Sequence, residues 1–91
     1  MIREKEVEIR EVKFKLREPL FKDFMEAYRK AKDDMQMFNI ILLSKCIIEP
    51  EMDSQKIMEL PMSVVTKLIM ELADLIEVDR KNLFTVLGPG E

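Results

Sequence analysis

The chain has no histidine, no tryptophan and a single cysteine among its 91 residues. Without histidine there is no Ser–His or Cys–His nucleophile pair, no imidazole acid–base catalysis and no histidine-ligated zinc. One cysteine cannot form a disulfide within the chain, which is typical of a reducing compartment. The two glycines form no glycine-rich phosphate loop. We therefore expect a non-enzymatic protein without catalytic, cofactor-binding or metal-binding residues.

Long hydrophobic runs are also missing. A membrane-spanning helix needs about 20 apolar residues in succession, and the longest apolar run here is Ile40–Leu43. The first residues, Met1–Lys5, are mostly charged and lack the apolar segment of a secretory signal. These patterns predict a cytoplasmic protein that does not enter the membrane.

The composition is that of a small folded domain, with 47% hydrophobic and 36% charged residues. We expect one domain over residues 1–87 and a flexible tail over 88–91, where glycine and proline stop regular structure. The net charge is −3, divided into +1 over residues 1–34 and −4 over residues 35–91. An acidic second half argues against nucleic acid as a partner, because that binding requires lysine and arginine at phosphates.

Residues 5–17 are the only segment with the two-residue period of a half-buried strand. The alternation has two phases, one with Val7 and Ile9 and the other with Val12, Phe14 and Leu16. The phase changes at Arg10-Glu11, where either a β-bulge or the turn of a short hairpin fits. Because no glycine, asparagine or proline marks a tight turn, we favour the bulged strand. Its pairing partner could come from the same chain or from a second copy.

Three helices are predicted after this strand. Pro19 suits the first turn of a helix over residues 19–32, and Asp34 can cap a strongly apolar helix over 35–48 that ends before Pro50. A connector with one helical turn at 54–58 leads to an amphipathic helix over 62–76, and Asp79 fits the cap of a further short helix. The predicted fold class is α+β and mostly helical, with an N-terminal strand or short hairpin followed by three packed helices.

Several residues could carry chemistry, but each has a simpler explanation. Glu49, Glu51 and Asp53 lack the further ligands and the glycine of a cation-binding loop, so a solvated acidic loop is the better interpretation. Cys46 lies in an apolar helix, which favours a buried, inert thiol. The alternating bases, Lys13, Lys15 and Arg17, fit the solvent-facing side of a sheet. A DNA-reading helix is disfavoured because residues 62–76 offer only Lys67 to bases.

Eight methionines are many for a chain of this length. Methionine side chains are flexible and fill irregular cores, but they also line adaptable binding surfaces. We hypothesise that exposed apolar side chains border a groove that holds a helix of another protein. Its bordering residues would be Phe21, Met25, Met58, Met62 and Leu68.

The run Leu16-Arg17-Glu18-Pro19, followed by the segment Asp23–Ala27, resembles the tail assembly chaperones of long-tailed phages and prophages. The similarity extends over about residues 7–78, through the apolar helix, the acidic connector and the Leu60-Pro61 dipeptide before the last helix. The resemblance implies binding to the tape-measure protein and help in assembling the tail tube. The alternative is a generic self-associating helical interaction module or small regulatory subunit, and a homo-oligomer is compatible with either.

Overall fold

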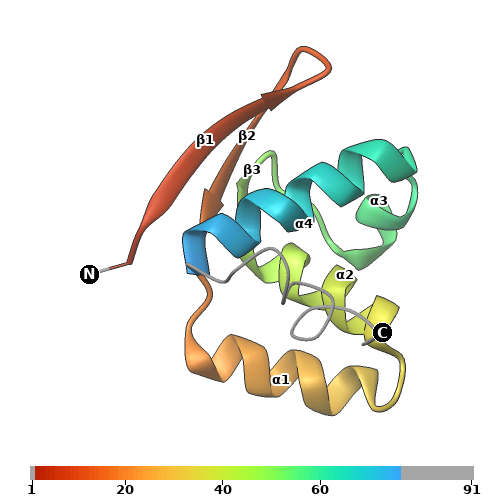
Figure 1. Cartoon of the computed structure of the whole chain (residues 1–91). Helices are drawn as coiled ribbons and strands as arrows, with labels where there is room; N and C mark the ends of the chain where they lie inside the picture. The colour runs from red at the N-terminus through yellow and green to blue at the C-terminus, as the bar shows by residue number, and fades with distance from the viewer. Residues whose placement is uncertain (1, 77–91) are drawn as a thin grey trace.

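Strands and helices share the chain in the computed structural model, which describes residues 2–76 (Figure 1). The elements are β1 (Glu4–Ile9), β2 (Val12–Arg17), α1 (Phe21–Ala31), α2 (Met35–Cys46), β3 (Ile47–Glu49), α3 (Ser54–Met58) and α4 (Met62–Ile76). The predicted α+β class is therefore confirmed. The predicted short helix after Asp79 and the predicted tail over 88–91 lie outside the described residues.

The first two strands form a hairpin, so the bulged-strand prediction was wrong. β1 and β2 pair antiparallel without a bulge, and the turn consists of Arg10 and Glu11 alone. Both turn residues have positive φ, 52° and 69°, as the mirror-image turns of tight hairpins require. The strand also pairs within its own chain, because the sheet order is β1-β2-β3.

Complementary charges on the outer face of the hairpin explain why it forms without a glycine in the turn. Three glutamates of β1 lie opposite three basic residues of β2, in the pairs Glu4–Arg17, Glu6–Lys15 and Glu8–Lys13. A diagonal ion pair between Lys15 Nζ and Glu4 Oε1 spans 3.6 Å. Opposite charges directly across a sheet stabilise it by about 0.2–1 kcal/mol per pair. A shift of register by one residue would lose all three pairs.

The turn itself remains unfavourable for its residue types, which gives a testable consequence. A left-handed conformation costs a residue with a side chain about 1–2 kcal/mol, whereas glycine adopts it freely. We expect Glu11→Gly to raise the free energy of unfolding by up to about 1 kcal/mol, measured by urea denaturation. Glu8→Gly, inside β1, is the control and should lower the free energy of unfolding instead. Equal effects of both changes would contradict the turn geometry.

The second helix is shorter than predicted. It begins after Asp34, whose side chain accepts a hydrogen bond from Met37 N at 3.0 Å as expected of a cap. It ends at Cys46, and β3 follows, with Ile47 opposite Leu16 and Glu49 opposite Lys15. Isoleucine is β-branched and fits a strand well. The apolar run that suggests one helix over 35–48 therefore contains a helix and a strand.

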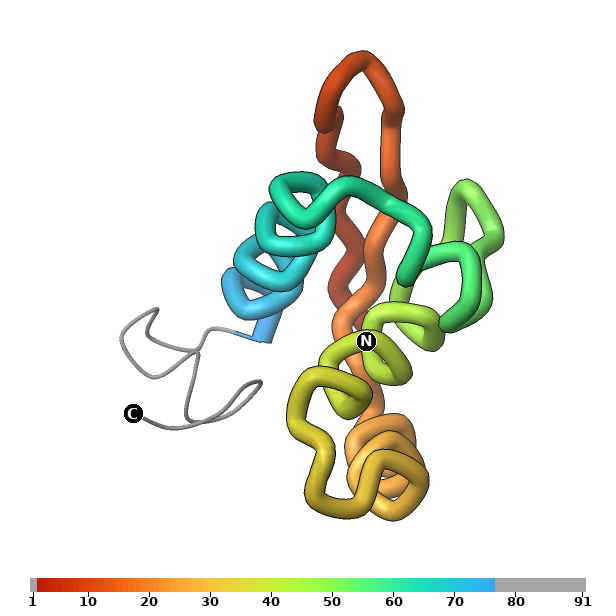
Figure 2. The backbone as a smooth tube through the Cα atoms, turned by 90° about the vertical axis from the view of Figure 1, so that its right-hand side faces the viewer, coloured from red at the N-terminus to blue at the C-terminus, as the bar shows by residue number. Residues whose placement is uncertain are grey.

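The core lies between the inner face of the sheet and helices α2 and α4. Figures 1 and 2 show α4 across the hairpin, while α1 lies beside α2 at the end of the molecule away from the hairpin turn. The largest fully buried side chains are Phe38, Leu16, Leu42, Leu43, Ile57, Leu68, Leu72 and Cys46. Lys5 of β1 forms an ion pair with Glu71 of α4, which fastens this helix to the sheet edge. No helix within residues 2–76 is long and apolar enough to cross a membrane.

Candidate protein-binding surface

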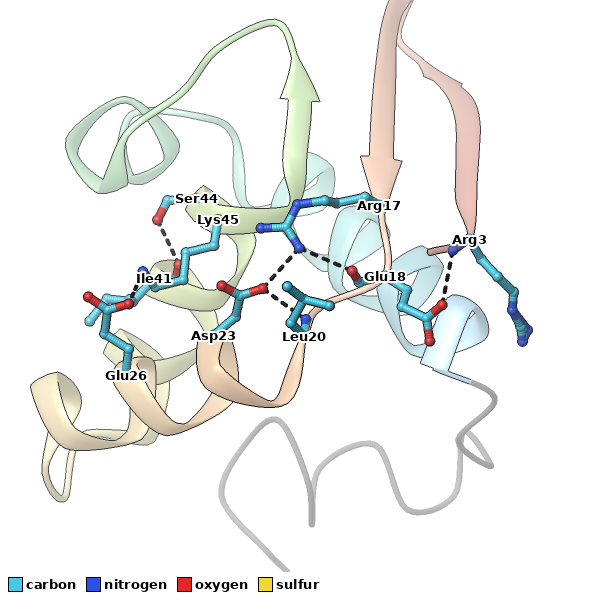
Figure 3. Close-up of polar contacts among 9 residues, drawn as sticks. All are labelled: Arg3, Arg17, Glu18, Leu20, Asp23, Glu26, Ile41, Ser44 and Lys45. Atoms are coloured by element: carbon cyan, nitrogen blue, oxygen red, sulfur yellow. Dashed lines mark hydrogen bonds and ion pairs between the residues drawn. The ribbon is translucent and has the colours of Figure 1, made fainter. Parts of the chain in front are cut away.

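A polar cluster fixes the direction in which α1 leaves the sheet (Figure 3). The carboxylate of Asp23 accepts hydrogen bonds from Leu20 N at 2.8 Å and from Arg17 Nη1 at 2.9 Å. The same Arg17 nitrogen also donates to the carbonyl oxygen of Glu18. Asp23 thus binds the backbone N–H that precedes α1 and links the helix to the end of β2. The predicted change from strand to helix occurs here, but Leu20 is the N-cap, so Pro19 lies just before the helix and not in its first turn as predicted.

The charge of Asp23 is stabilised although the residue is buried. Burial, the largest single effect, would raise the pKa of its carboxyl group, but the hydrogen bonds from Arg17 and Leu20 together with nearby positive charges outweigh it. The positive charges of Arg17 and Lys45 act in the same direction, and the pKa of Asp23 lies below its ordinary value. The carboxylate therefore stays ionised at neutral pH, and its pairing with Arg17 is permanent there.

A second link ties α1 to α2. Lys45 Nζ donates to Glu26 Oε1 at 2.8 Å, and Lys30 lies 3.9 Å from the other carboxylate oxygen. The hydrogen bond from Lys45 is the main reason that the pKa of Glu26 is lowered. Glu26 thus pairs with Lys30 four residues later on α1, and Lys45 adds a bond between helices. Both acidic side chains of α1 are engaged with bases on the side of the helix that faces the domain.

The opposite side of α1 is apolar and open to solvent. Phe21 is 75% exposed, Tyr28 57% and Met25 42%, and Leu20 at the helix start is also exposed. These four residues lie within two turns of helix, and we refer to them as the α1 patch. Single exposed apolar residues are common on protein surfaces, but a contiguous group that includes two aromatic rings indicates an interaction site.

Ring stacking holds the aromatic residues of the α1 patch in place. Phe24 stacks on Phe21 and on Tyr28, with ring centroids 5.9 Å and 6.2 Å apart. On its other side Phe24 meets the buried ring of Phe38 edge to face at 5.4 Å. The exposed rings are thus connected to the core through Phe24. These rings are already ordered, so they lose little side-chain entropy when a partner binds them.

The free charges next to the α1 patch are positive. Lys22, Arg29 and Lys32 are exposed and form no ion pair with any residue in the described part of the chain. Helical spacing puts Arg29 beside Met25. Lys32 follows the last residue of α1, and its backbone N–H donates to Tyr28 O. An apolar surface with a basic border would suit an amphipathic segment that carries acidic residues beside its apolar stripe.

The predicted groove is not formed as one surface. Met58 and Met62 are 54% and 85% exposed, but they lie at the α3–α4 corner, while Phe21 and Met25 lie on α1. Figures 1 and 2 place that corner and α1 on different parts of the molecule. Leu68 is fully buried, so its prediction as a binding residue is corrected: it faces the sheet as part of the core stripe of α4.

Met62 borders a different hollow. An open groove of about 620 Å³ runs along α4, with Met62 and Met70 as its apolar residues among those described. Its remaining described lining consists of Ser63, Thr66, Lys67 and Glu71. At the start of α4, Val64 N and Val65 N both donate to the backbone oxygen of Pro61, so the Ser63 side chain does not cap the helix. Ser63 Oγ instead accepts a hydrogen bond from Arg10 of the hairpin turn at 2.8 Å.

Sequence reasoning selected Phe21 and Met25 but missed Tyr28, Leu20 and the basic border. Helical spacing puts Tyr28 on the same face as Phe24, but no sequence signal says which part of a wide apolar face is covered. Ala27 and Ala31, which are fully or almost fully buried, were the available signal. Small residues on one side of a helix permit close packing, so they mark the side that faces α2, and Tyr28 then points away from it.

The other candidate sites keep their simpler explanations. Asp53 caps α3 through a hydrogen bond from Lys56 N, and no group of acidic, cysteine or histidine residues within 2–76 could hold a metal ion. Burial raises the pKa of the Cys46 thiol to about 12, only partly opposed by the charges of Arg17 and Lys45. Cys46 is therefore a protonated core residue at neutral pH. Arg17 binds Asp23, so of the three strand bases it is the least available to an outside ligand.

No protein-family model matches this chain, and comparisons with curated proteins and with solved structures find no match either. The role of the protein is therefore inferred from its own surface and from the sequence pattern described above.

Proposed function

We propose that this protein is a non-enzymatic binding factor that covers an apolar helical segment of another protein through the α1 patch. The observation that carries the proposal is the ordered, exposed aromatic group on α1, Phe21 and Tyr28 stacked on Phe24. Aromatic residues dominate the binding energy of protein interfaces when a partner desolvates them. The residue inventory contains no histidine and no glycine-rich loop, which disfavours catalysis as the main activity.

The resemblance of Leu16–Pro19 and Asp23–Ala27 to tail assembly chaperones suggests what the partner is. We propose the tape-measure protein, a long helical protein around which tail-tube subunits polymerise. A helix of this kind exposes apolar side chains until it is enclosed, and a covering domain would keep it from aggregating. The helix would lie along the α1 patch, with its acidic residues next to Lys22, Arg29 and Lys32.

The test is whether the α1 patch keeps a tape-measure fragment in solution. The fragment is mixed with the full chain and the mixture is measured by size-exclusion chromatography with light scattering. We expect a soluble complex where the fragment alone precipitates. The triple variant Phe21→Ala/Met25→Ala/Tyr28→Ala should weaken binding at least about a hundredfold, because truncation of interface hot spots costs about 2 kcal/mol or more each.

The double variant Met58→Ala/Met62→Ala is the matched control. It removes two exposed apolar side chains from the α3–α4 corner and should leave the affinity for the fragment within about threefold of the original. Equal loss in both variants would shift the binding site away from α1. A stable oligomer of the chain that ignores the fragment would overturn the tape-measure proposal and favour a self-associating interaction module.

A further inference from the structure

Strand β1 forms an open edge of the sheet. It pairs with β2 on one side only, since the strand order is β1-β2-β3. In Figure 1 β1 is the outer strand of the hairpin, with no described element along its far side. The edge is six residues long, Glu4–Ile9, while the opposite edge, β3, has only three residues. An open edge of this length is a template for one more strand unless its side chains prevent it.

The backbone groups that an added strand needs belong to the three glutamates of β1. Glu18 N donates to Arg3 O at 2.8 Å, so the Arg3–Glu18 pair is a hydrogen-bonded one. Hydrogen-bonded and non-bonded pairs alternate along an antiparallel ladder. With the observed register, Lys5, Val7 and Ile9 direct their N–H and C=O groups to β2. Those of Glu4, Glu6 and Glu8 point outward from the sheet.

The side chains of this edge favour a neighbouring strand with positive charges and disfavour one with negative charges. Glu4, Glu6 and Glu8 are exposed and lie on the outer face, while Val7 and Ile9 lie on the inner face. A second copy that paired β1 with β1 would put glutamate beside glutamate, which is destabilising. β2 already shows which sequence this strand accepts, because each of the three glutamates has a basic residue opposite it. The same preference holds for a neighbour on the open side.

We propose that the β1 edge binds an added β-strand of another protein, in which lysine or arginine alternates with apolar residues. The basic side chains would lie beside Glu4, Glu6 and Glu8 on the outer face. The apolar ones would lie beside Val7 and the aliphatic stem of Lys5 on the inner face, where Phe14 and Leu16 lie opposite them in β2. Backbone hydrogen bonds would supply affinity and the alternating charges specificity. This inference is independent of the α1 patch and of the proposed tape-measure partner.

The test uses three short peptides and the full chain. The first has the sequence TKVKVKT, the second is its acidic counterpart TEVEVET, and the third, KKKTVVT, is a rearrangement of the first that keeps its charge. Binding is followed by NMR titration and amide hydrogen exchange. We expect the alternating basic peptide to bind at least about tenfold tighter than either control. Binding should also slow the exchange of the Glu6 and Glu8 amides, which point away from β2.

A variant of the edge checks the mode of binding. Glu6→Pro removes an outward N–H but no hydrogen bond to β2, a position where proline is tolerated in an edge strand. It should abolish peptide binding, whereas Glu6→Thr keeps the N–H and should weaken it only a few-fold. The exchange of the Phe14 and Leu16 amides reports whether the hairpin persists.

If Glu6→Pro opens the hairpin, the comparison of peptides on the unaltered chain still decides the question. Equal binding of the alternating and rearranged basic peptides would overturn the proposal, because it would show charge attraction without strand pairing. Binding without slower exchange at Glu6 and Glu8 would overturn it as well. Neither result would affect the tape-measure proposal, which the α1 variants test separately.

Discussion

Phe38→Ala is expected to lower the free energy of unfolding by about 4 kcal/mol, since truncating a fully buried phenylalanine costs 3–5 kcal/mol. The ring of Phe38 is 1% exposed and lies on α2 in the main core. Its removal leaves a cavity and also takes away the edge-to-face contact with Phe24 at 5.4 Å. Because small domains are stable by only about 5–15 kcal/mol, much of the margin would be lost. Urea denaturation, followed by circular dichroism, measures the free energy of unfolding of the variant and of the original chain.

Phe21→Ala is the matched control for this prediction. It deletes the same ring from a side chain that is 75% exposed and stacks on Phe24. We expect a loss below about 1 kcal/mol, as for other exposed contacts. Equal free energies of unfolding for the two variants would mean that the Phe38 ring is not buried in the core. Phe38→Ala should also weaken partner binding at α1, because Phe24 would lose the contact that holds the exposed rings.

The long helices were predictable because their apolar spacing is regular. Val64, Leu68 and Leu72 recur with helical spacing and are all buried in α4, whose bounds match the prediction of 62–76. Asp34 was identified as the cap of α2 from its residue type alone, and Asp53 caps α3 in the same way although it was considered only as part of the acidic loop. These local rules depend on neighbours in the sequence, which is why one sequence suffices to apply them.

The hairpin was the less favoured of the two alternatives because the turn was judged by its own residues. Arg10 and Glu11 are poor residues for positive φ, and they adopt it because the flanking strands require a two-residue turn. The available signal was in those strands: glutamates at every second position before the turn, and bases at every second position after it. Folding the sequence at Arg10-Glu11 brings each acid opposite a base. Opposite charges at matching distances from a candidate turn therefore deserve as much weight as the turn residues.

The end of α2 depends on tertiary contacts that no periodicity reveals. Ile47 and Ile48 continue an apolar run that suits a helix or a buried strand equally. The run becomes a strand because β2 offers Leu16 and Lys15 as partners. By contrast, helical spacing does separate Leu68 from Met62. Leu68 belongs to the buried stripe of α4, whereas Met62, six residues earlier, lies on another side of the helix and is 85% exposed.

The Arg17–Asp23 link gives a pH-dependent prediction. Asp23→Asn is expected to lower the free energy of unfolding by about 2 kcal/mol at pH 7, because hydrogen bonds to charged groups contribute about 1.5–3 kcal/mol. The pKa of Asp23 is lowered in the folded state, so the carboxylate stabilises the fold fully above its ordinary pKa of 3.8. That stabilisation is lost as the pH falls from there through the lower pKa of the folded state. The gap between the original chain and the variant should therefore close in acid.

Urea denaturation of both proteins at neutral pH and in steps below pH 4 measures this gap directly. Asp33→Asn is the control, since Asp33 is exposed between α1 and α2 and forms no ion pair with any residue in 2–76. It should change stability by less than about 0.5 kcal/mol at any of these pH values. A gap for Asp23→Asn that stays constant with pH would mean that the ionised carboxylate is not what Arg17 and Leu20 N bind. In that case Arg17→Met should change the free energy of unfolding little. We expect instead that it lowers this free energy at least as much as Asp23→Asn does, because it leaves a buried carboxylate without its cation.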